Sequence, residues 1–312
     1  MSAGSVLDPA GPAAARAAEA AWLLLGGGAL VFVLVMALLA WVVARRRGDA
    51  AGAPARVAPA AWIVGGGVVF PAVVLVSLFA YQELRLPAEA SPGDPLIVSV
   101  TARMWWWEVR YRDPSSGREI ALANEIHLPA GRPVVIGLNS ADVIHSFWVP
   151  ALAGKVDMIP GRVTQLRVEA ARPGRYQGPC AEFCGDQHAR MALEVVVEEP
   201  AAFARWLEAE ARPAAPPRGG SAERGLAVFT GERCTACHAV RGVAEGSSDG
   251  PDLTHVASRR RIGAGTLPAD AAGLARWVSS VQHVKPGARM PSYERIDPES
   301  LAALAAFLAG LR

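Results

Sequence analysis

Cysteine is scarce in this sequence, and the few cysteines are not spread along it. Only four occur among 312 residues, in "CAEFC" at 180–184 and in "CTACH" at 234–238. Four cysteines could form two disulfides in an exported domain. Each pair, however, has a histidine close behind it, His188 in one case and His238 in the other. This arrangement indicates a use other than cross-linking.

Net charge is almost absent as well. The formal charge is +2, from 31 basic and 29 acidic residues, which argues against a nucleic-acid partner because such partners require a strongly basic surface. We find no internal repeat. Residues 1–20 also lack the basic n-region and apolar h-region of a signal peptide.

Charge is missing entirely from two long runs, residues 21–44 and 57–82. At 1.5 Å per residue, each run can cross a hydrocarbon core of about 30 Å. The alternative is a pair of buried core helices, but globular helices rarely stay uncharged over such a length. Pro71 can kink the second run, which membrane helices tolerate better than soluble ones.

The loop between the two runs is basic, with "RRR" at 45–47 and Arg56. An excess of basic residues in a short loop marks the cytoplasmic side of a membrane. We therefore expect an exported segment at 1–20 and a transmembrane helix hairpin at 21–90. The predicted localisation is a bacterial cell membrane, multi-pass, with the rest of the chain on the outer or periplasmic side.

Residues 91–200 have the pattern of a β-sandwich. Short runs rich in β-branched residues, such as "LIVSVTAR" and "MALEVVVEE", roughly alternate and are separated by turn signals such as "DPSSG" and "IPG". Residues 201–220 contain a short helical stretch and the Pro-rich "RPAAPPRGG", and we interpret them as a linker. Residues 221–312 are amphipathic and helical, with "DPES" as a helix start. The expected fold is therefore membrane-anchored and multidomain: a hairpin, a β-sandwich and a small all-α domain.

The sequence "CTACH" has the C-x-x-C-H spacing of covalent heme c attachment. On a helical turn, Cys234 and Cys237 can both reach the porphyrin while His238 points at the iron. A thioredoxin-like redox pair is the alternative, but such pairs lie in βαβ units. Met290, in a loop with Pro and Gly, is the candidate sixth ligand, because a His/Met pair suits electron transfer. His255 and His283 are its competitors for that position.

The stretch "CAEFCGDQHARM" at 180–191 allows three interpretations. It could hold a Cys180–Cys184 disulfide, or a zinc ion, although structural zinc sites normally use two close pairs of ligands. Thiolate and thioether donors beside imidazole favour copper. Blue-copper sites place such donors on a loop between two strands, as here; the difference is the second cysteine, since two thiolates can bridge two copper ions.

Taken together, these motifs resemble cytochrome c oxidase subunit II, whose dinuclear copper (CuA) loop has the pattern C-x-E-x-C-x3-H-x2-M. The resemblance extends to "LDPAGP" before the first apolar run, "WWWEVRY" at 105–111, "HSFWVP" at 145–150 and "KVDMIPGR" at 155–162. It implies a cupredoxin-like fold for residues 91–200. Residues 221–312 resemble a class I cytochrome c through "GLAVF", "CTACH", "GPDL" at 250–253 and "MP" at 290–291. The fusion of the two is similar to the caa-type heme-copper oxidases.

The resemblance also implies roles for single residues. Cys180 and Cys184 would bridge both coppers, and the remaining copper ligands would be His145, His188, Met191 and the backbone carbonyl of Glu182. The Glu182 side chain would face a magnesium or manganese ion shared with subunit I. The carbonyl of Pro251 would accept a hydrogen bond from His238, and Trp105 would lie where electrons enter. His127 matches no ligand position, and we interpret it as structural.

The implied function is an electron relay within a proton-pumping oxidase. A donor, either cytochrome c or a quinol–cytochrome c reductase, would reduce heme c, and the electron would pass to the CuA centre and on to heme a of subunit I. Subunit III would be a further partner, and the oxygen-reducing site would lie outside this chain. The alternatives are the CuA and heme c subunit of a nitric oxide reductase, and a copper chaperone or sensor.

Overall fold

The computed structural model describes residues 5–46, 59–84 and 94–312, and the chain divides into two compact units. One unit comprises residues 21–93, and the other joins residues 1–20 to residues 94–312. The predicted start of the second apolar run at 57–58, its basic loop at 47–56 and the end of the hairpin at 85–90 lie outside the described residues.

The first unit consists of two long apolar helical segments. They are α1 (Pro12–Arg46) and a second segment made of α2 (Pro59–Val64), a π-helical turn (Gly65–Val69) and α3 (Phe70–Leu84). Both are long and apolar enough to cross a membrane, and no residue of their most apolar 18-residue windows is buried. The wide turn falls just before Pro71, whose ring removes a backbone donor and disturbs the preceding turn. This feature accounts for the irregularity that Pro71 predicts.

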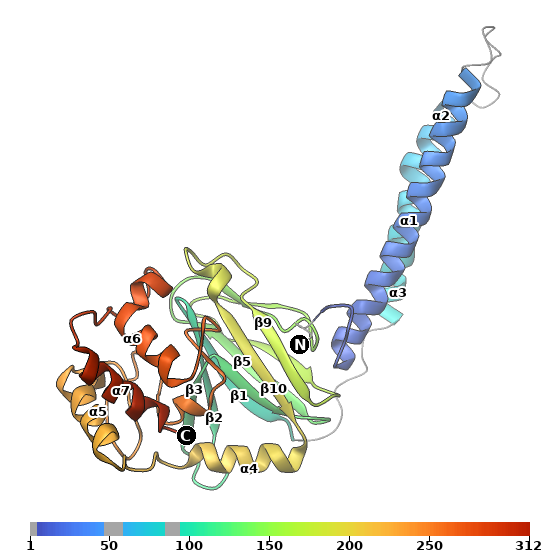
Figure 1. Cartoon of the computed structure of the whole chain (residues 1–312). Coiled ribbons are helices and arrows are strands. Elements are labelled where there is room, and N and C mark those ends of the chain that lie inside the picture. Colours follow the sequence, from blue (N-terminus) through green and yellow to red (C-terminus); the bar gives the residue numbers. More distant parts are fainter. Residues whose placement is uncertain (1–4, 47–58, 85–93) are drawn as a thin grey trace. The chain divides into compact units, whose positions relative to one another are not determined.

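The sheet domain of the second unit is a sandwich (Figure 1). One sheet has the strand order β3-β2-β1-β5-β8, another has the order β4-β10-β9, and β6 pairs with β7. The strands are β1 (Leu96–Arg103), β2 (Trp106–Arg112), β3 (Glu119–Ala123), β4 (Glu125–Pro129), β5 (Pro133–Ser140), β6 (His145–Phe147), β7 (Val156–Met158), β8 (Thr164–Glu169), β9 (Gly174–Pro179) and β10 (Ala192–Glu198).

Alternation of side chains along the strands builds the core of this sandwich. In β5 every second residue is buried, including Val134, Ile136 and Leu138, as expected when one face of a strand packs inward. These residues share one hydrophobic core with Ile126 of β4 and Val195 of β10. The core therefore joins the two larger sheets, and the expectation of a cupredoxin-like sandwich is confirmed.

Residues before the first apolar run also belong to this domain. The Ala10 amide donates to the Ala151 carbonyl at 2.6 Å, and the Ala171 amide donates to the Ala10 carbonyl at 2.7 Å. A Cβ at Gly11 would collide with the carbonyl oxygen of Glu169, so only glycine fits this close approach. The "LDPAGP" segment thus packs on the sheet domain before α1 departs.

Helix α4 (Pro200–Ala211) occupies the first half of the segment interpreted as a linker. Phe203 and Leu207 are buried in the core of the sheet domain. The ring of Trp206 stacks on His127 at 3.9 Å, nearly parallel. This half of the segment is therefore a packed part of the sheet domain, and the Pro-rich residues from Arg212 onward follow it.

The C-terminal domain is helical, with α5 (Gly220–Gly231), α6 (Ala271–Val284) and α7 (Pro298–Ala309) around a second hydrophobic core. A small hairpin pairs β11 (Arg261–Ile262) with β12 (Leu267–Pro268). Asp270 and Asp297 cap α6 and α7 through their side chains. Helices α5 and α7 approach closely at Gly225, where a Cβ would collide with the Ala303 carbonyl.

Candidate functional site: a sulfur-rich cluster beside an apolar cavity

The loop between β9 and β10 carries the first cysteine pair. Cys180 follows the last residue of β9, and Met191 precedes the first residue of β10. The Cys180 amide donates to the Met191 carbonyl at 2.9 Å, so the antiparallel ladder of these strands closes the loop at its base. His145 is the first residue of β6 and comes to the loop from a distant part of the chain.

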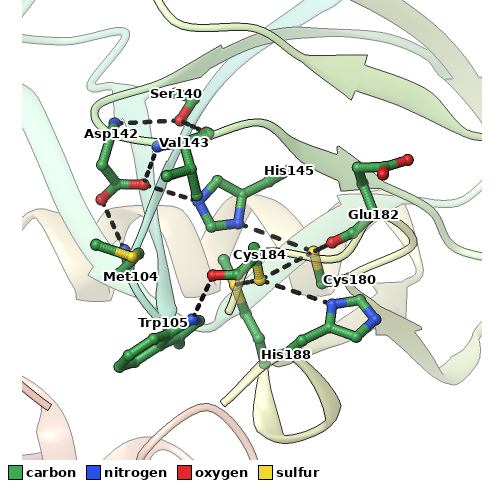
Figure 2. A network of polar contacts seen from close by, with 11 residues as sticks. Met104, Trp105, Ser140, Asp142, Val143, His145, Cys180, Glu182, Cys184 and His188 are labelled. Atoms are coloured by element: carbon green, nitrogen blue, oxygen red, sulfur yellow. Dashed lines mark hydrogen bonds and ion pairs between the residues drawn. The ribbon is translucent and has the colours of Figure 1, made fainter. Parts of the chain in front are cut away.

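The loop brings five predicted copper donors together (Figure 2). Cys180 Sγ and Cys184 Sγ are 3.9 Å apart. The Nδ1 atom of His145 lies 3.9 Å from Cys180 Sγ, and that of His188 lies 3.6 Å from Cys184 Sγ. Met191 Sδ is 3.9 Å from Cys184 Sγ. Donor atoms of His145, Cys180 and Cys184 also satisfy the spacing of a metal-binding group.

The backbone carbonyl of Glu182 faces the same cluster, and the Cys180 thiol donates to it at 3.3 Å. The Glu182 carboxylate points away from the sulfurs (Figure 2). Next to it, Phe183 is 76% exposed. The carbonyl is thus the part of Glu182 that lies with the predicted copper donors.

Asp142 is a functional candidate that sequence reasoning missed. Its carboxylate accepts from His145 Nε2 at 2.8 Å and from the Met104 and Val143 amides, each at 2.8 Å. The bond to Nε2 leaves Nδ1 of His145 directed at Cys180. A carboxylate on the outer nitrogen is the usual way to orient a ligating imidazole. The only sequence signal was the spacing of Asp142, three residues before His145.

Electrostatics distinguish the two thiols of the cluster. Burial raises the pKa of Cys180, but hydrogen bonds from the His145 ring and the Ser146 amide lower it below its usual value. Burial raises the pKa of Cys184, and the neighbouring Cys180 raises it further. Burial lowers the pKa of His145, but its bonds to Asp142 and Cys180 bring that pKa up to about 9. In the metal-free chain, one thiolate beside one imidazolium is therefore favoured.

The second cysteine pair lines a cavity of about 260 Å³. Cys234 begins a 3₁₀ turn (Cys234–Ala236), and Cys237 and His238 follow it directly. All three line the cavity, and so does Met290. His238 Nδ1 donates to the Pro251 carbonyl at 2.7 Å. Burial lowers the pKa of His238, which favours the neutral ring that a metal ligand needs.

The other residues around this cavity fit a heme. The walls are mostly apolar, with Phe229, Leu274 and Leu304 among them. Arg259 also lines the cavity; it is 8% exposed, and its Nε has no hydrogen-bond partner among the described residues. Its Nη2 donates to the Asp252 carbonyl at 2.7 Å, so a guanidinium with one donor still available lies beside an apolar slot, which suits the carboxylate of a porphyrin. Sequence reasoning missed Arg259, since it is one of three consecutive arginines.

Two histidines that compete with Met290 lie elsewhere. His255 is buried, and its Nε2 bonds to the Arg212 carbonyl at 3.0 Å. The His283 side chain is 80% exposed and faces Glu294. Among the described residues that line the cavity, His238 is the histidine present. His127 lies apart from both sites, between Glu125 and Glu198 at 2.9 Å each.

Trp105 touches both sites. Its Nε1 donates to the Cys184 carbonyl at 2.8 Å, and its ring lines the cavity beside the second cysteine pair. A Cβ on Gly185 would lie 3.2 Å from this ring, and one on Gly287 would lie 3.3 Å from it. The indole therefore packs against two glycines. Gly185 belongs to the loop between β9 and β10, here called the copper loop, and Gly287 belongs to the helical domain.

Comparisons with known proteins agree with this two-site arrangement. Residues 108–199 match the family model described as cytochrome C oxidase subunit II, periplasmic domain, and residues 222–312 match the cytochrome c model. The copper and heme c chemistry of these families matches the two sites, and their periplasmic placement agrees with anchoring by the two apolar helices.

The chain is similar to cytochrome c oxidase subunit 2 of several bacteria. Cytochrome c oxidase subunit 2 of Alkalihalophilus pseudofirmus is 34% identical over 217 residues, which cover 70% of this chain and 61% of the relative. That of Bacillus subtilis is 29% identical over 229 residues, covering 70% of this chain and 63% of the relative. The chain thus spans somewhat under two thirds of their length. The crystal structure of the periplasmic domain of subunit II of cytochrome oxidase of Bradyrhizobium japonicum is 31% identical, covers 39% of this chain and 96% of that one, and has a TM-score of 0.36.

Proposed function

Since residues 108–199 belong to the family of cytochrome c oxidase subunit II periplasmic domains and residues 222–312 to the cytochrome c family, we propose that this chain is the electron-transfer subunit of a proton-pumping terminal oxidase. Electrons enter at a covalent heme c, pass to a dinuclear CuA centre, and leave to heme a of subunit I, where oxygen is reduced to water. Each transfer moves one electron, so the donor site is oxidised as the acceptor site is reduced.

Six residues would hold the copper pair. Cys180 and Cys184 would bridge the two ions, and the other donors would be His145, His188, Met191 and the Glu182 carbonyl. The spacing of the two sulfurs, 3.9 Å, and the ring nitrogens within 3.6 to 3.9 Å of them support this assignment. Soft sulfur donors beside imidazole select copper over harder cations. When bound, the pair supplies a one-electron carrier whose charge is shared between two metals.

The heme assignment rests on a separate donor set. Cys234 and Cys237 would carry the covalent bonds, while His238 and Met290 would hold the iron from opposite faces. The Pro251 carbonyl orients His238, and Arg259, whose Nε has no hydrogen-bond partner among the described residues, would bind a propionate. His/Met ligation suits electron transfer and leaves no open position for oxygen. This chain therefore carries electrons, and the catalytic centre belongs to its partner.

Two features support docking on subunit I. Phe183, Ile144 and Val143 are exposed apolar residues close in sequence to predicted copper ligands, and the Glu182 carboxylate points away from the sulfurs (Figure 2). An exposed apolar patch of this kind marks an interaction site. We assign to Glu182 the magnesium or manganese ion shared with subunit I. Subunit III is a further partner, and the electron donor is cytochrome c or a quinol–cytochrome c reductase. The two apolar segments span the membrane with both domains on its outer side.

The single observation that carries this proposal is the position of Trp105, whose ring lines the heme cavity and whose Nε1 bonds to Cys184. A copper chaperone or sensor has no use for such a connection. A nitric oxide reductase subunit would use the same two sites and remains the second candidate; a neighbouring catalytic subunit with or without the oxidase copper ligands separates the two.

The experiment is Cys184→Ser in the assembled complex, followed by stopped-flow reduction. Loss of one bridging sulfur should disrupt the copper pair while the helical domain still folds and attaches heme. We expect the donor to reduce heme c at the wild-type rate and heme a to stay oxidised. If heme a is reduced at the wild-type rate in the copper-depleted variant, the order from heme c through copper to subunit I is wrong. In the wild-type chain, EPR must show one electron shared by two copper nuclei; splitting by a single copper nucleus contradicts the dinuclear assignment.

A further inference from the structure

Lys285 lies at the junction of the sheet domain and the helical domain. It directly follows α6 as its C-cap, and its amide donates to the Val281 carbonyl at 2.7 Å. Its side chain turns away from its own helix and is only 3% exposed. A lysine is almost never this buried unless its amine is satisfied by partners.

The partners of Lys285 are three backbone carbonyls from three segments. Its Nζ donates to Trp105 at 2.7 Å, to Arg190 at 2.8 Å and to Gly263 at 3.2 Å. Trp105 precedes β2, Arg190 belongs to the copper loop, and Gly263 belongs to the β11–β12 turn of the helical domain. An ammonium has three donors, so one side chain ties all three segments together and keeps none of its donors free.

The copper loop also contacts the end of α6 through one of its own side chains. Arg190 Nη1 donates to the Val284 carbonyl at 2.7 Å, next to Lys285, at the end of α6 where carbonyls lack helical partners. Two residues beyond Lys285, Gly287 has a φ of +81° and lies against the Trp105 ring. The same short segment therefore holds the backbone of Trp105 through Lys285 and touches its indole through Gly287.

Neither hydrophobic core explains Lys285. The sheet domain and the helical domain each have a core of their own, with no shared member. Burial lowers the pKa of Lys285 to about 7. A neutral amine keeps two of the three N–H donors, so the full set of three bonds requires the charged form. The bonds of Lys285 instead connect the segment that carries Trp105, the loop of Cys180 and Cys184, and the helical domain.

We propose that Lys285 is a positioning residue that fixes the distance between the copper site and the heme site, by holding the Trp105 backbone and the copper loop against the end of α6. This inference rests on the proposed function, because it assumes that both sites are filled. Lys285 is not one of the proposed copper or heme ligands, although it lines part of the heme cavity. It holds the two domains in a single relative position, so that the distance over which each electron moves between heme and copper is constant.

The test is pulsed EPR on the oxidised, fully loaded full-length chain, in which the copper pair and the low-spin heme each carry an unpaired electron. Their dipolar coupling falls steeply with separation and reports the distance distribution directly. We expect one narrow distribution in the wild type and loss of that narrow peak in Lys285→Met. Lys155→Met makes the same change at an exposed position of the sheet domain and should leave the distribution unchanged.

Arg190→Met provides a second, milder variant, since it removes only the returning bond to Val284. It should broaden the distribution less than Lys285→Met does. The optical spectra and potentials of both sites should match wild type in each variant, which separates a lost position from a damaged site. An unchanged narrow peak in Lys285→Met overturns the proposal.

A metal-free measurement keeps this inference separate from the proposed function. In the full chain without copper, hydrogen exchange followed by mass spectrometry should show faster exchange in Lys285→Met at two remote segments, around Trp105 and around the copper loop. Faster exchange confined to the helical domain would mean that Lys285 only supports its own domain. If the wild type lacks the paired-copper signal but the two remote segments still respond, the proposed function fails and the positioning role stands.

Discussion

The copper site and the heme site are built on opposite principles. The proposed copper donors come mainly from one loop, and Cys180, Cys184 and Met191 are members of the sheet-domain core. The proposed heme donors come from segments about fifty residues apart and line a cavity of about 260 Å³. A space within the sheet core, lined by residues such as Ile126 and Phe147, is about 10 Å³. The sheet domain packs directly around its site, whereas the site of the helical domain is a cavity.

This difference separates what each cofactor does for its domain. Buried thiols pack like small apolar groups, so the sheet domain is well packed before copper arrives. In the helical domain, core residues such as Phe229 and Leu304 are also cavity walls. The sheet domain therefore does not need copper for its packing, whereas the helical domain needs heme to fill its core.

The largest expected effect follows directly. Cys234→Ala combined with Cys237→Ala should prevent heme attachment and leave the cavity unfilled. At about 24 cal/mol per Å³ this costs on the order of 6 kcal/mol, comparable with the total stability of a small domain, about 5–15 kcal/mol. We expect the helical domain to unfold at physiological temperature, measured by circular dichroism and limited proteolysis.

The matched variant is Cys180→Ser combined with Cys184→Ser. It removes the bridging sulfurs but leaves no large cavity, so the sheet domain should remain folded without copper. Equal loss of structure in both double variants would mean that the two domains depend on their cofactors alike.

A smaller effect, in the sheet domain alone, is expected from His127→Ala. His127 lies between Glu125 and Glu198 and stacks on Trp206 of α4. Removing one partner of a buried ionic group costs about 3–5 kcal/mol. Thermal unfolding should show the sheet domain destabilised by this amount while the heme spectrum stays that of the wild type. A shift of under 1.4 kcal/mol, a factor of ten in the equilibrium, would show that Trp206 and the strands hold α4 without the ion pairs.

The same residue gives the sheet domain a pH dependence. Burial lowers the pKa of His127, but the hydrogen bonds to Glu125 and Glu198 outweigh burial and raise it above its ordinary 6.5. A raised folded-state pKa stabilises the fold fully below the unfolded value and loses that contribution as the pH rises through the folded value. Stability of the sheet domain should therefore fall as the pH rises above about 6.5, and His127→Gln should flatten this part of the curve. Urea titrations at several pH values measure it.

The smallest effect on either fold is expected from Met290→Ala. Covalent attachment depends on Cys234 and Cys237, so heme should stay bound and the domain folded. Loss of the thioether, which favours reduced iron, should lower the heme potential and abolish the near-infrared methionine–iron band. His283→Ala is the control: its exposed pair with Glu294 should change stability by no more than about 0.5 kcal/mol. An unchanged band in Met290→Ala would exclude Met290 as the ligand.

Sequence reasoning performed best where chemistry imposes a spacing. The two cysteine motifs predicted where donors gather, because a loop of fixed length can reach only certain atoms. The apolar runs, the alternation and the helix start signals predict two apolar helices, a β-sandwich and a helical domain, and this fold class is confirmed. These features depend on neighbours within a few residues of each other.

Features that depend on distant partners were missed. Asp142 could not be identified as the orienting carboxylate of His145 without knowing how β6 enters the site. Lys285 and Trp105 are separated by 180 positions, and no local pattern links them. Arg259 was hidden among adjacent arginines, and α4 was interpreted as part of a linker because its short apolar stripe did not reveal what it packs against.

The contact of Ala10 with Ala151 and Ala171 has a consequence for how the protein is made. In the proposed two-span arrangement, the segment before α1 and the sheet domain are separated by both membrane crossings, yet they form one folded body. Synthesis and insertion must therefore carry that short segment across the bilayer before the sheet domain can be finished. Folding of the sheet domain then depends on translocation of the segment before α1. If translocation failed, the "LDPAGP" segment would stay on the opposite side of the membrane from the sheet domain, and that domain would lose the contacts that Ala10 makes.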